Sequence, residues 1–198
     1  MESVVLLDER GEAIGTAAKA TVHHARTPLH LAFSCYLFDS AGRLLLTRRA
    51  LTKKTWPGVW TNTCCGHPLP GEAVADAVRR RLTDELGIAP TSLDLILPRF
   101  RYTATMDDGV RENEMCPVFR ATTDKQPHPE PAEVDSYRWV DWTTLLSGVA
   151  DGSQPISPWC TDQLRELAVL GADPLGWPTG STAELPPAAL ARNGDLRG

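Results

Sequence analysis

CCGHPLPGEAVADAVRRRLTDELGI, residues 64–88, is the stretch that decides the fold of this chain. It opens with Cys-Gly-His and then turns, because two prolines and a glycine within four residues break regular structure. The turn leads into a helix predicted over residues 72–86. Gly87 follows at once, as expected for a glycine that ends a helix in the left-handed conformation.

One face of this predicted helix is apolar, because Val74, Val78 and Leu82 recur every four residues. A helix with such a face packs it against a core. Arg81 and Glu85 are also four residues apart and fall beside that face. A cation and an anion at the edge of a core, next to a loop with a thiol and an imidazole, indicate a functional site.

The stretch resembles the signature of Nudix proteins, Gly-x5-Glu-x7-Arg-Glu-U-x-Glu-Glu-x-Gly-U, in which U is aliphatic. Two positions depart from it, since Arg81 stands where a glutamate is expected and Asp84 replaces the first glutamate of the pair. Nudix hydrolases gather several carboxylates around Mg²⁺, so these departures argue against ordinary hydrolysis. The positions that fit in register are Gly66, Glu72, Arg80, Leu82, Glu85, Gly87 and Ile88.

The rest of the chain resembles type 1 isopentenyl-diphosphate isomerases, which have the Nudix fold and do not hydrolyse their diphosphate. The shared features run in the family's order and spacing over about residues 3–170. The resemblance implies an α/β protein, a Nudix-like α/β/α sandwich with a mixed sheet. It also implies an isomerase of isoprenoid biosynthesis that interconverts isopentenyl and dimethylallyl diphosphate through a carbocation-like species. The shared features are His23, His30, TRRALTKKTWPGVWTN (47–62), Cys65-Gly66-His67, RYTAT (101–105), Glu112-Asn113-Glu114 and Ser157-Pro158-Trp159.

Composition excludes several other classes of protein. The chain has 198 residues, 42% of them hydrophobic, which is enough for one domain with a substantial core. Its net charge is −5 and no basic run exceeds three residues, so we expect no nucleic-acid partner. No apolar run approaches the roughly 20 residues of a membrane span, and no signal pattern opens the chain. The five cysteines, two of them adjacent, then predict reduced thiols in a cytoplasmic protein, which we expect to be monomeric.

The order of elements follows from apolar patterns and turn residues. Helices are predicted over residues 142–146 and 157–170, the latter with Ser157 as its N-cap. The isomerase domain should therefore cover residues 1–170, with a Pro/Gly/Ala-rich, loosely ordered and dispensable tail over residues 171–198. Strands are predicted over residues 3–7, 13–18, 29–38, 43–49, 93–103, 112–122 and 136–140, and loops over residues 53–63 and 126–132.

A metal site is the first chemical prediction. Glu112 and Glu114 are two apart on a predicted strand, so their side chains point to the same face, although a solvated strand face would look the same. A single histidine is more often structural than ligating, but imidazoles and carboxylates together suit Zn²⁺, Mn²⁺ or Mg²⁺. The resemblance assigns the ligands of one divalent ion as His23, His30, His67, Glu112 and Glu114; matching from Lys19 and His30 selects His23 over His24.

Isomerising a terminal alkene requires adding a proton at one carbon and removing one at another, which two groups on opposite faces of the substrate can do. Cys65 and Glu114 are the candidates for this pair. Cys64 is the adjacent alternative and a buried structural thiol is the ordinary role of cysteine, but the Cys-Gly-His register favours Cys65. The resemblance adds Tyr102 as an aid to proton delivery and Trp159 as an indole facing the substrate, whereas core packing is their ordinary role.

The diphosphate must be held without being cleaved. Mg²⁺ is typically bound by one or two carboxylates together with substrate phosphates. The resemblance gives that role to Glu85 and to the backbone carbonyl of Cys65. Arg81, which stands where a hydrolase has a glutamate, would then supply a positive charge for the diphosphate. The rivals are a Nudix hydrolase of another diphosphate, and a non-catalytic binding module. The basic residues that match phosphate-binding positions are Lys19, Arg49, Lys53 and Arg81, each of which alone could be a surface charge.

Overall fold

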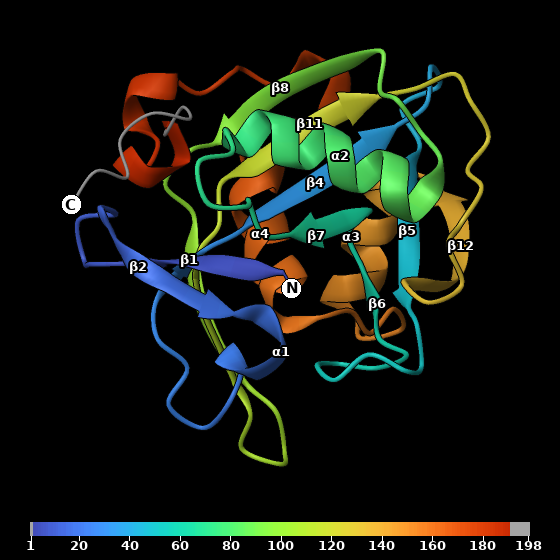
Figure 1. Cartoon of the computed structure of the whole chain (residues 1–198). Coiled ribbons are helices and arrows are strands. Elements are labelled where there is room, and N and C mark those ends of the chain that lie inside the picture. The colour runs from blue at the N-terminus through green and yellow to red at the C-terminus, as the bar shows by residue number, and fades with distance from the viewer. Residues whose placement is uncertain (1, 191–198) are drawn as a thin grey trace.

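The computed structural model describes residues 2–190 and arranges them as two mixed β-sheets with helices (Figure 1). The smaller sheet has the order β2-β1-β3-β10-β9, with β1 Ser3–Leu7, β2 Ala13–Ala18, β3 His30–Leu31, β9 Arg101–Thr105 and β10 Arg111–Met115. The larger sheet has the order β12-β5-β4-β11-β8, with β4 Phe33–Phe38, β5 Leu44–Arg49, β8 Ser92–Leu97, β11 Val118–Thr122 and β12 Val134–Val140. Two short strands extend it, β6 Trp60–Thr61 on β5 and β7 Cys64–Gly66 on β4.

Helices cover both faces of the larger sheet, as Figure 1 shows for α2 in front of β4 and for α3 and α4 behind it. Alternate residues of β4 face opposite ways: Phe33 and Leu37 pack in the core beneath α2, whereas Tyr36 and Phe38 pack with Trp142 of α3. The predicted α/β/α sandwich with a mixed sheet is therefore confirmed. The helices are α1 Lys19–Val22, α2 Val74–Leu86, α3 Trp142–Ala150 and α4 Pro158–Ala168.

Helix α2 begins two residues later than predicted and ends where predicted. Gly87 takes a φ of 66°, a left-handed conformation that suits glycine, and its N–H bonds to the last turn of the helix. The Glu72 carboxylate accepts a hydrogen bond from the Leu69 N–H at 2.8 Å and pairs with Arg80 at 2.8 Å. These bonds fix the loop before the helix, which is the loop that carries His67.

Three predicted strands are each split in two, because the chain passes from one sheet to the other in their middle. Residues 29–38 divide at Ala32, between β3 and β4, and residues 112–122 divide at Cys116 and Pro117, between β10 and β11. The two crossings run in parallel and are bonded to each other, since the Ala32 N–H donates to the Met115 carbonyl at 2.9 Å. Residues 93–103 divide in the same way between β8 and β9. Side chains near these crossings therefore point into the space between the sheets.

The segment after residue 170 differs from the predicted loose tail. Residues 171–190 form three short 3₁₀ helices, η1 Pro174–Gly176, η2 Thr182–Glu184 and η3 Pro187–Leu190. Trp177 is 3% exposed and its ring lies 4.9 Å from that of Trp142. The Arg120 guanidinium donates to three backbone carbonyls of residues 174–177, at 2.8 to 3.3 Å. The domain thus continues to residue 190, while residues 191–198 lie outside the described part.

We expect Trp177→Ala to lower the free energy of unfolding by about 3–5 kcal/mol, because it removes a buried indole from the core behind the sheet. Leu175→Ala is the matched control in the same turn, since Leu175 is 38% exposed, and should change stability by less than about 1 kcal/mol. Chemical denaturation followed by circular dichroism measures both. Equal, small losses for the two variants would support the dispensable tail that composition predicts.

Candidate functional site

A cavity of about 480 Å³ opens between the sheets, at the point where the chain crosses between them. Its wall combines charged side chains, imidazoles, one thiol and two aromatic rings. Every residue predicted to act in catalysis or to bind phosphate contributes to it. The lining residues are Glu2, Lys19, Ala20, His23, Arg49, Lys53, Lys54, Thr55, Cys65, Gly66, His67, Arg81, Tyr102, Glu112, Glu114 and Trp159.

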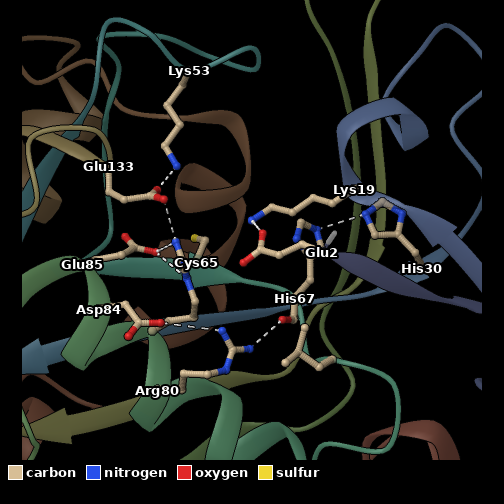
Figure 2. Close-up of polar contacts among 12 residues, drawn as sticks. Glu2, Lys19, His30, Lys53, Cys65, His67, Arg80, Asp84, Glu85 and Glu133 are labelled. Atoms are coloured by element: carbon tan, nitrogen blue, oxygen red, sulfur yellow. Dashed lines mark hydrogen bonds and ion pairs between the residues drawn. The ribbon is translucent and has the colours of Figure 1, made fainter.

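Four of the five predicted metal ligands meet beside this cavity, which His23, His67 and Glu114 line and the buried His30 does not. His23 follows α1, His30 lies on β3, His67 follows β7 and Glu114 lies on β10. One potential ligand atom from each lies within 4.8 Å of all the others. The Glu114 Oε1 atom is 3.4 Å from His30 Nε2 and 3.1 Å from His67 Nε2 (Figure 2 shows His30 and His67).

Glu112 lies beside this group and outside it. Its Oε2 atom is 3.0 Å from Nε2 of His23, yet neither atom makes a well-oriented hydrogen bond with any described residue. The Nδ1 atom of His67 is likewise buried without a partner among residues 2–190. Glu112 is thus close enough to act with His23, while the four-residue group excludes it.

The donor set fits a divalent cation. Nδ1 of His30 lies 2.9 Å from the Pro28 carbonyl oxygen, which can only accept a hydrogen bond, so Nδ1 carries the proton and Nε2 of the neutral ring carries the lone pair. That lone pair faces Nε2 of His67 at 3.2 Å and the Glu114 carboxylate. Nitrogen and oxygen lone pairs that converge in this way repel one another unless a proton or a cation lies between them. Such a His/Glu group is a candidate site for a divalent metal ion.

The protonation states of His67 and Glu114 also suit metal binding. Burial lowers the pKa of His67 to about 4, so its imidazole is neutral and can offer a lone pair at neutral pH. Burial disfavours the charged form of Glu114, but interactions with the His30 and His67 imidazoles outweigh it and hold the pKa of Glu114 well below its usual range. A neutral imidazole and an ionised carboxylate are the forms in which these groups bind metals.

The two adjacent cysteines of β7 point to opposite faces of the strand. Cys64 is 2% exposed and points into the core beneath α2, and burial raises its pKa well above the usual range. Cys65 points the other way and lines the cavity, with its Sγ atom 3.4 Å from Ser34 Oγ and 3.2 Å from Asn62 Oδ1. Burial raises the pKa of Cys65 to about 11, which keeps it a protonated thiol at neutral pH. Alternation along the strand thus favours Cys65 over Cys64.

Aromatic side chains form the wall near the thiol. Trp159 stands at the start of α4, where the Ser157 side chain caps the helix, and is 3% exposed. Its ring lies 5.9 Å from that of Tyr102 on β9, and the Arg49 guanidinium carbon lies 5.6 Å from the indole centroid. The cavity therefore has an apolar, electron-rich side that suits a hydrocarbon chain or a developing cation.

The four predicted phosphate-binding cations also line the cavity and are engaged by groups of the chain itself. Lys19 bonds to Glu2 at 2.6 Å, and the Arg49 guanidinium bonds to the Thr55 carbonyl at 2.8 Å. Lys53 pairs with Glu133, as Figure 2 shows. The carboxylates of Glu2 and Glu133 were not predicted, because they approach these cations only in three dimensions.

Arg81 on α2 also lines the cavity. Its guanidinium lies 2.6 Å from the Glu85 carboxylate and 3.2 Å from that of Glu133. Glu85 does not line the main cavity but borders a small adjoining cavity that Cys65 also lines. Burial raises the pKa of Glu85, against the lowering effect of Arg81. The predicted Mg²⁺ ligands, Glu85 and the Cys65 carbonyl, thus belong to adjoining elements, α2 and β7.

Comparisons with known proteins agree with this geometry. The NUDIX domain family matches residues 28–160. The DR0079 protein of Deinococcus radiodurans has a similar fold, with a TM-score of 0.67 over 83% of this chain and 98% of that one at 19% identity. The MutT protein of Methanosarcina mazei also resembles it, with a TM-score of 0.58 over 70% of this chain and 92% of that one at 19% identity. Fold and site thus define a Nudix-domain protein.

Closer relatives narrow the class. The isopentenyl-diphosphate Delta-isomerase of Saccharopolyspora erythraea is 57% identical over 98% of this chain and 100% of its own length. The protein of the same name from Mycolicibacterium vanbaalenii is 57% identical over 86% of this chain and 93% of its own length. The chain belongs to the isopentenyl-diphosphate Delta-isomerase family. Among residues 2–190, no helix has the length and apolarity that a membrane span requires.

Proposed function

We propose that the protein interconverts isopentenyl diphosphate and dimethylallyl diphosphate, with Cys65 and Glu114 as the groups that move protons. The observation that carries this proposal is the cavity itself. It places a thiol, a carboxylate from the His/Glu group, an indole and four cations around one space. The substrate needs the same groups, since its five-carbon apolar chain suits the indole and its diphosphate suits the cations.

The reaction moves one double bond along the chain. A proton added to the terminal CH₂ leaves a tertiary cation at the neighbouring carbon, and loss of a proton from the next CH₂ forms the new double bond. One proton enters and one leaves, so no oxidant or reductant is needed. We propose that Cys65 and Glu114 divide these two steps, with Tyr102 aiding delivery of the proton at the Glu114 side.

The two ligand sets are proposed to hold different ions. His23, His30, His67 and Glu114, with Glu112 beside them, would bind one divalent ion, Mn²⁺, Zn²⁺ or Mg²⁺. When bound, this ion favours the ionised form of Glu114. Glu85 and the Cys65 backbone carbonyl would bind Mg²⁺ together with the diphosphate.

The Trp159 ring is proposed to face the cation while it exists. An aromatic face near a positive charge is worth about 0.5–2 kcal/mol, with the larger values where water is excluded. Exclusion of water also matters because hydration of the cation would give an alcohol. Trp159 and Tyr102 are both buried, which supports a dry apolar end of the cavity.

The four cations are proposed to bind the diphosphate in place of their present partners. For Arg81→Gln we expect KM to rise about 10–100-fold, because a charged hydrogen bond is worth about 1.5–3 kcal/mol. Arg79→Gln is the matched control, since Arg79 lies on the same helix, pairs with Asp76 and lies outside the cavity lining. Steady-state kinetics compare the two variants. An unchanged KM in Arg81→Gln would remove this residue from the phosphate site.

The function is tested by incubating the protein with isopentenyl diphosphate and Mg²⁺ in deuterated water. We expect dimethylallyl diphosphate that contains deuterium, without release of phosphate. Phosphate release would favour a Nudix hydrolase, whose rival prediction of acidic residues at positions 81 and 84 is met only by Asp84. Binding of the diphosphate without turnover would favour the other rival, a non-catalytic binding module. Cytoplasmic location and a monomeric state stay predictions, with five free cysteines in keeping with a reducing compartment.

A further inference from the structure

Behind the cavity wall, one buried side chain contacts both the thiol and the indole of the proposed site. Asn62 is 0% exposed and lies in the turn between β6 and β7. Its Oδ1 atom is 3.2 Å from Cys65 Sγ and 3.2 Å from Trp159 Nε1. Cys65 and Trp159 are 94 residues apart in sequence (159 − 65), so this amide links two distant elements through a single atom.

The orientation of the Asn62 amide follows from its neighbours. Its Nδ2 atom lies 3.1 Å from the Cys35 carbonyl oxygen and 2.9 Å from that of Cys64, and both of these can only accept. Its Oδ1 atom faces the indole N–H of Trp159, which can only donate. Three neighbours thus require the same orientation, without reference to the sulfur. The contact with Cys65 must then be donation from S–H to Oδ1.

Two lone pairs of an amide oxygen are enough for the thiol and the indole. A third neighbour, Thr61 Oγ1, lies 2.9 Å from Oδ1, but its proton has another acceptor in Ser157 Oγ at 2.7 Å. Ser157 is the N-cap of α4, the helix that carries Trp159. The group around Asn62 therefore fixes the indole through its own N–H and also through the start of its helix.

A second contact holds the sulfur from the other side. Ser34 Oγ is 3.4 Å from Cys65 Sγ and accepts a hydrogen bond from Gln163 Nε2 at 2.8 Å. The Gln163 amide is oriented in turn by the Tyr36 hydroxyl, which donates to its Oε1 atom at 2.8 Å. Ser34, Tyr36 and Gln163 are all 0% exposed. The sulfur thus lies between two buried polar groups, and only Asn62 also contacts the indole.

We propose that Asn62 is a positioning residue, which sets the Cys65 sulfur and the Trp159 ring relative to each other through its shared amide oxygen. This inference rests on the proposed roles of Cys65 and Trp159. Asn62 does not line the main cavity and acts through these two groups rather than on the substrate. A proton-transfer group and the ring that faces the cation must be correctly placed together, because small errors in position are costly in rate.

The test is Asn62→Ala, with Thr63→Val as the matched control. Thr63 is the next residue, is 1% exposed, and makes two structural hydrogen bonds, to the Leu37 N–H and the Leu45 carbonyl. We expect Asn62→Ala to lower kcat about 100-fold with KM within about threefold, since binding is retained and alignment is lost. Thr63→Val should lower the thermal midpoint of unfolding at least as much as Asn62→Ala does. It should leave kcat within about threefold of the wild-type value.

A spectroscopic measurement separates this inference from the proposed function. The indole N–H resonance of Trp159, assigned by its loss in Trp159→Phe, should shift upfield and exchange faster with solvent in Asn62→Ala, whether or not the protein isomerises anything. If wild-type protein fails to isomerise, the proposed function fails while this readout still tests the hydrogen bond. If the resonance does not change, the joint contact is absent and the inference is wrong.

If Asn62→Ala is too unstable to purify, Asn62→Ser replaces it. A serine hydroxyl, together with a water, can bond the Cys35 and Cys64 carbonyls. It is too short to reach both the Cys65 thiol and the Trp159 indole N–H. The same thresholds apply. A kcat within about threefold of wild type would overturn the inference, since alignment errors of the expected size cost far more. The same holds if kcat falls as much in Thr63→Val as in the Asn62 variant, because loss of structure would then explain both results.

Discussion

Cys65→Ala is expected to lower kcat by about 10³–10⁴-fold, which is the contribution of a positioned acid–base group at its upper end. The methyl group cannot carry a proton, and no other thiol among the described residues lines the cavity. KM should change by less than about threefold, because the cations proposed to hold the diphosphate are unchanged in this variant. Steady-state conversion of isopentenyl diphosphate, with deuterium incorporation as a sensitive readout, measures the loss.

Cys64→Ala is the control for this variant. The two cysteines are adjacent, but Cys64 points into the core beneath α2 and Cys65 into the cavity. The control should lose about 1–2 kcal/mol of stability by leaving a small void, and keep kcat within about threefold. Near-normal turnover in Cys65→Ala would refute the assignment of the thiol. The reverse pattern, with loss only in Cys64→Ala, would show that the Cys-Gly-His register misleads.

The sequence predicts the elements of this fold well where periodicity and turn chemistry agree. The apolar face of α2 and its glycine cap are examples, and so is Ser157 at the start of α4. The crossings between the sheets were missed, because an apolar run such as residues 29–38 continues through the crossing without a change of pattern. The order of residues 171–190 was missed because it depends on Trp177 reaching a core built from distant residues.

The site likewise has residues that the sequence predicts and residues that it does not predict. The family resemblance selected the thiol, the imidazoles and the carboxylates, and the structure brings them together in or directly beside one cavity. The partners of these groups could not be predicted. Glu2 and Glu133 engage the cations from distant segments, and Asn62 meets Trp159 only because β6 and α4 are packed together. A motif identifies groups that do chemistry, whereas the groups that orient them depend on the tertiary fold.

Glu114→Gln is the second variant with a large expected effect, because it removes one charge that we propose serves both metal binding and proton transfer. The amide keeps the size of the side chain but can neither accept a proton at neutral pH nor attract a cation as a carboxylate does. We expect kcat to fall about 10³-fold or more, combining loss of an acid–base group with weaker metal binding. Metal affinity should fall by at least about 10-fold.

Asn113→Ala is the control, since Asn113 lies between Glu112 and Glu114 on β10 but points to the opposite face, where it donates to the Thr27 carbonyl at 3.3 Å. It should keep both metal content and kcat near wild type. Metal content is measured after dialysis against a limiting concentration of Zn²⁺ or Mn²⁺, separately from turnover. If Glu114→Gln loses turnover but keeps its metal, the carboxylate acts on the proton alone. If it keeps turnover as well, the four-residue group is not part of the catalytic site, because no described carboxylate apart from Glu114 lies within reach of both His30 and His67.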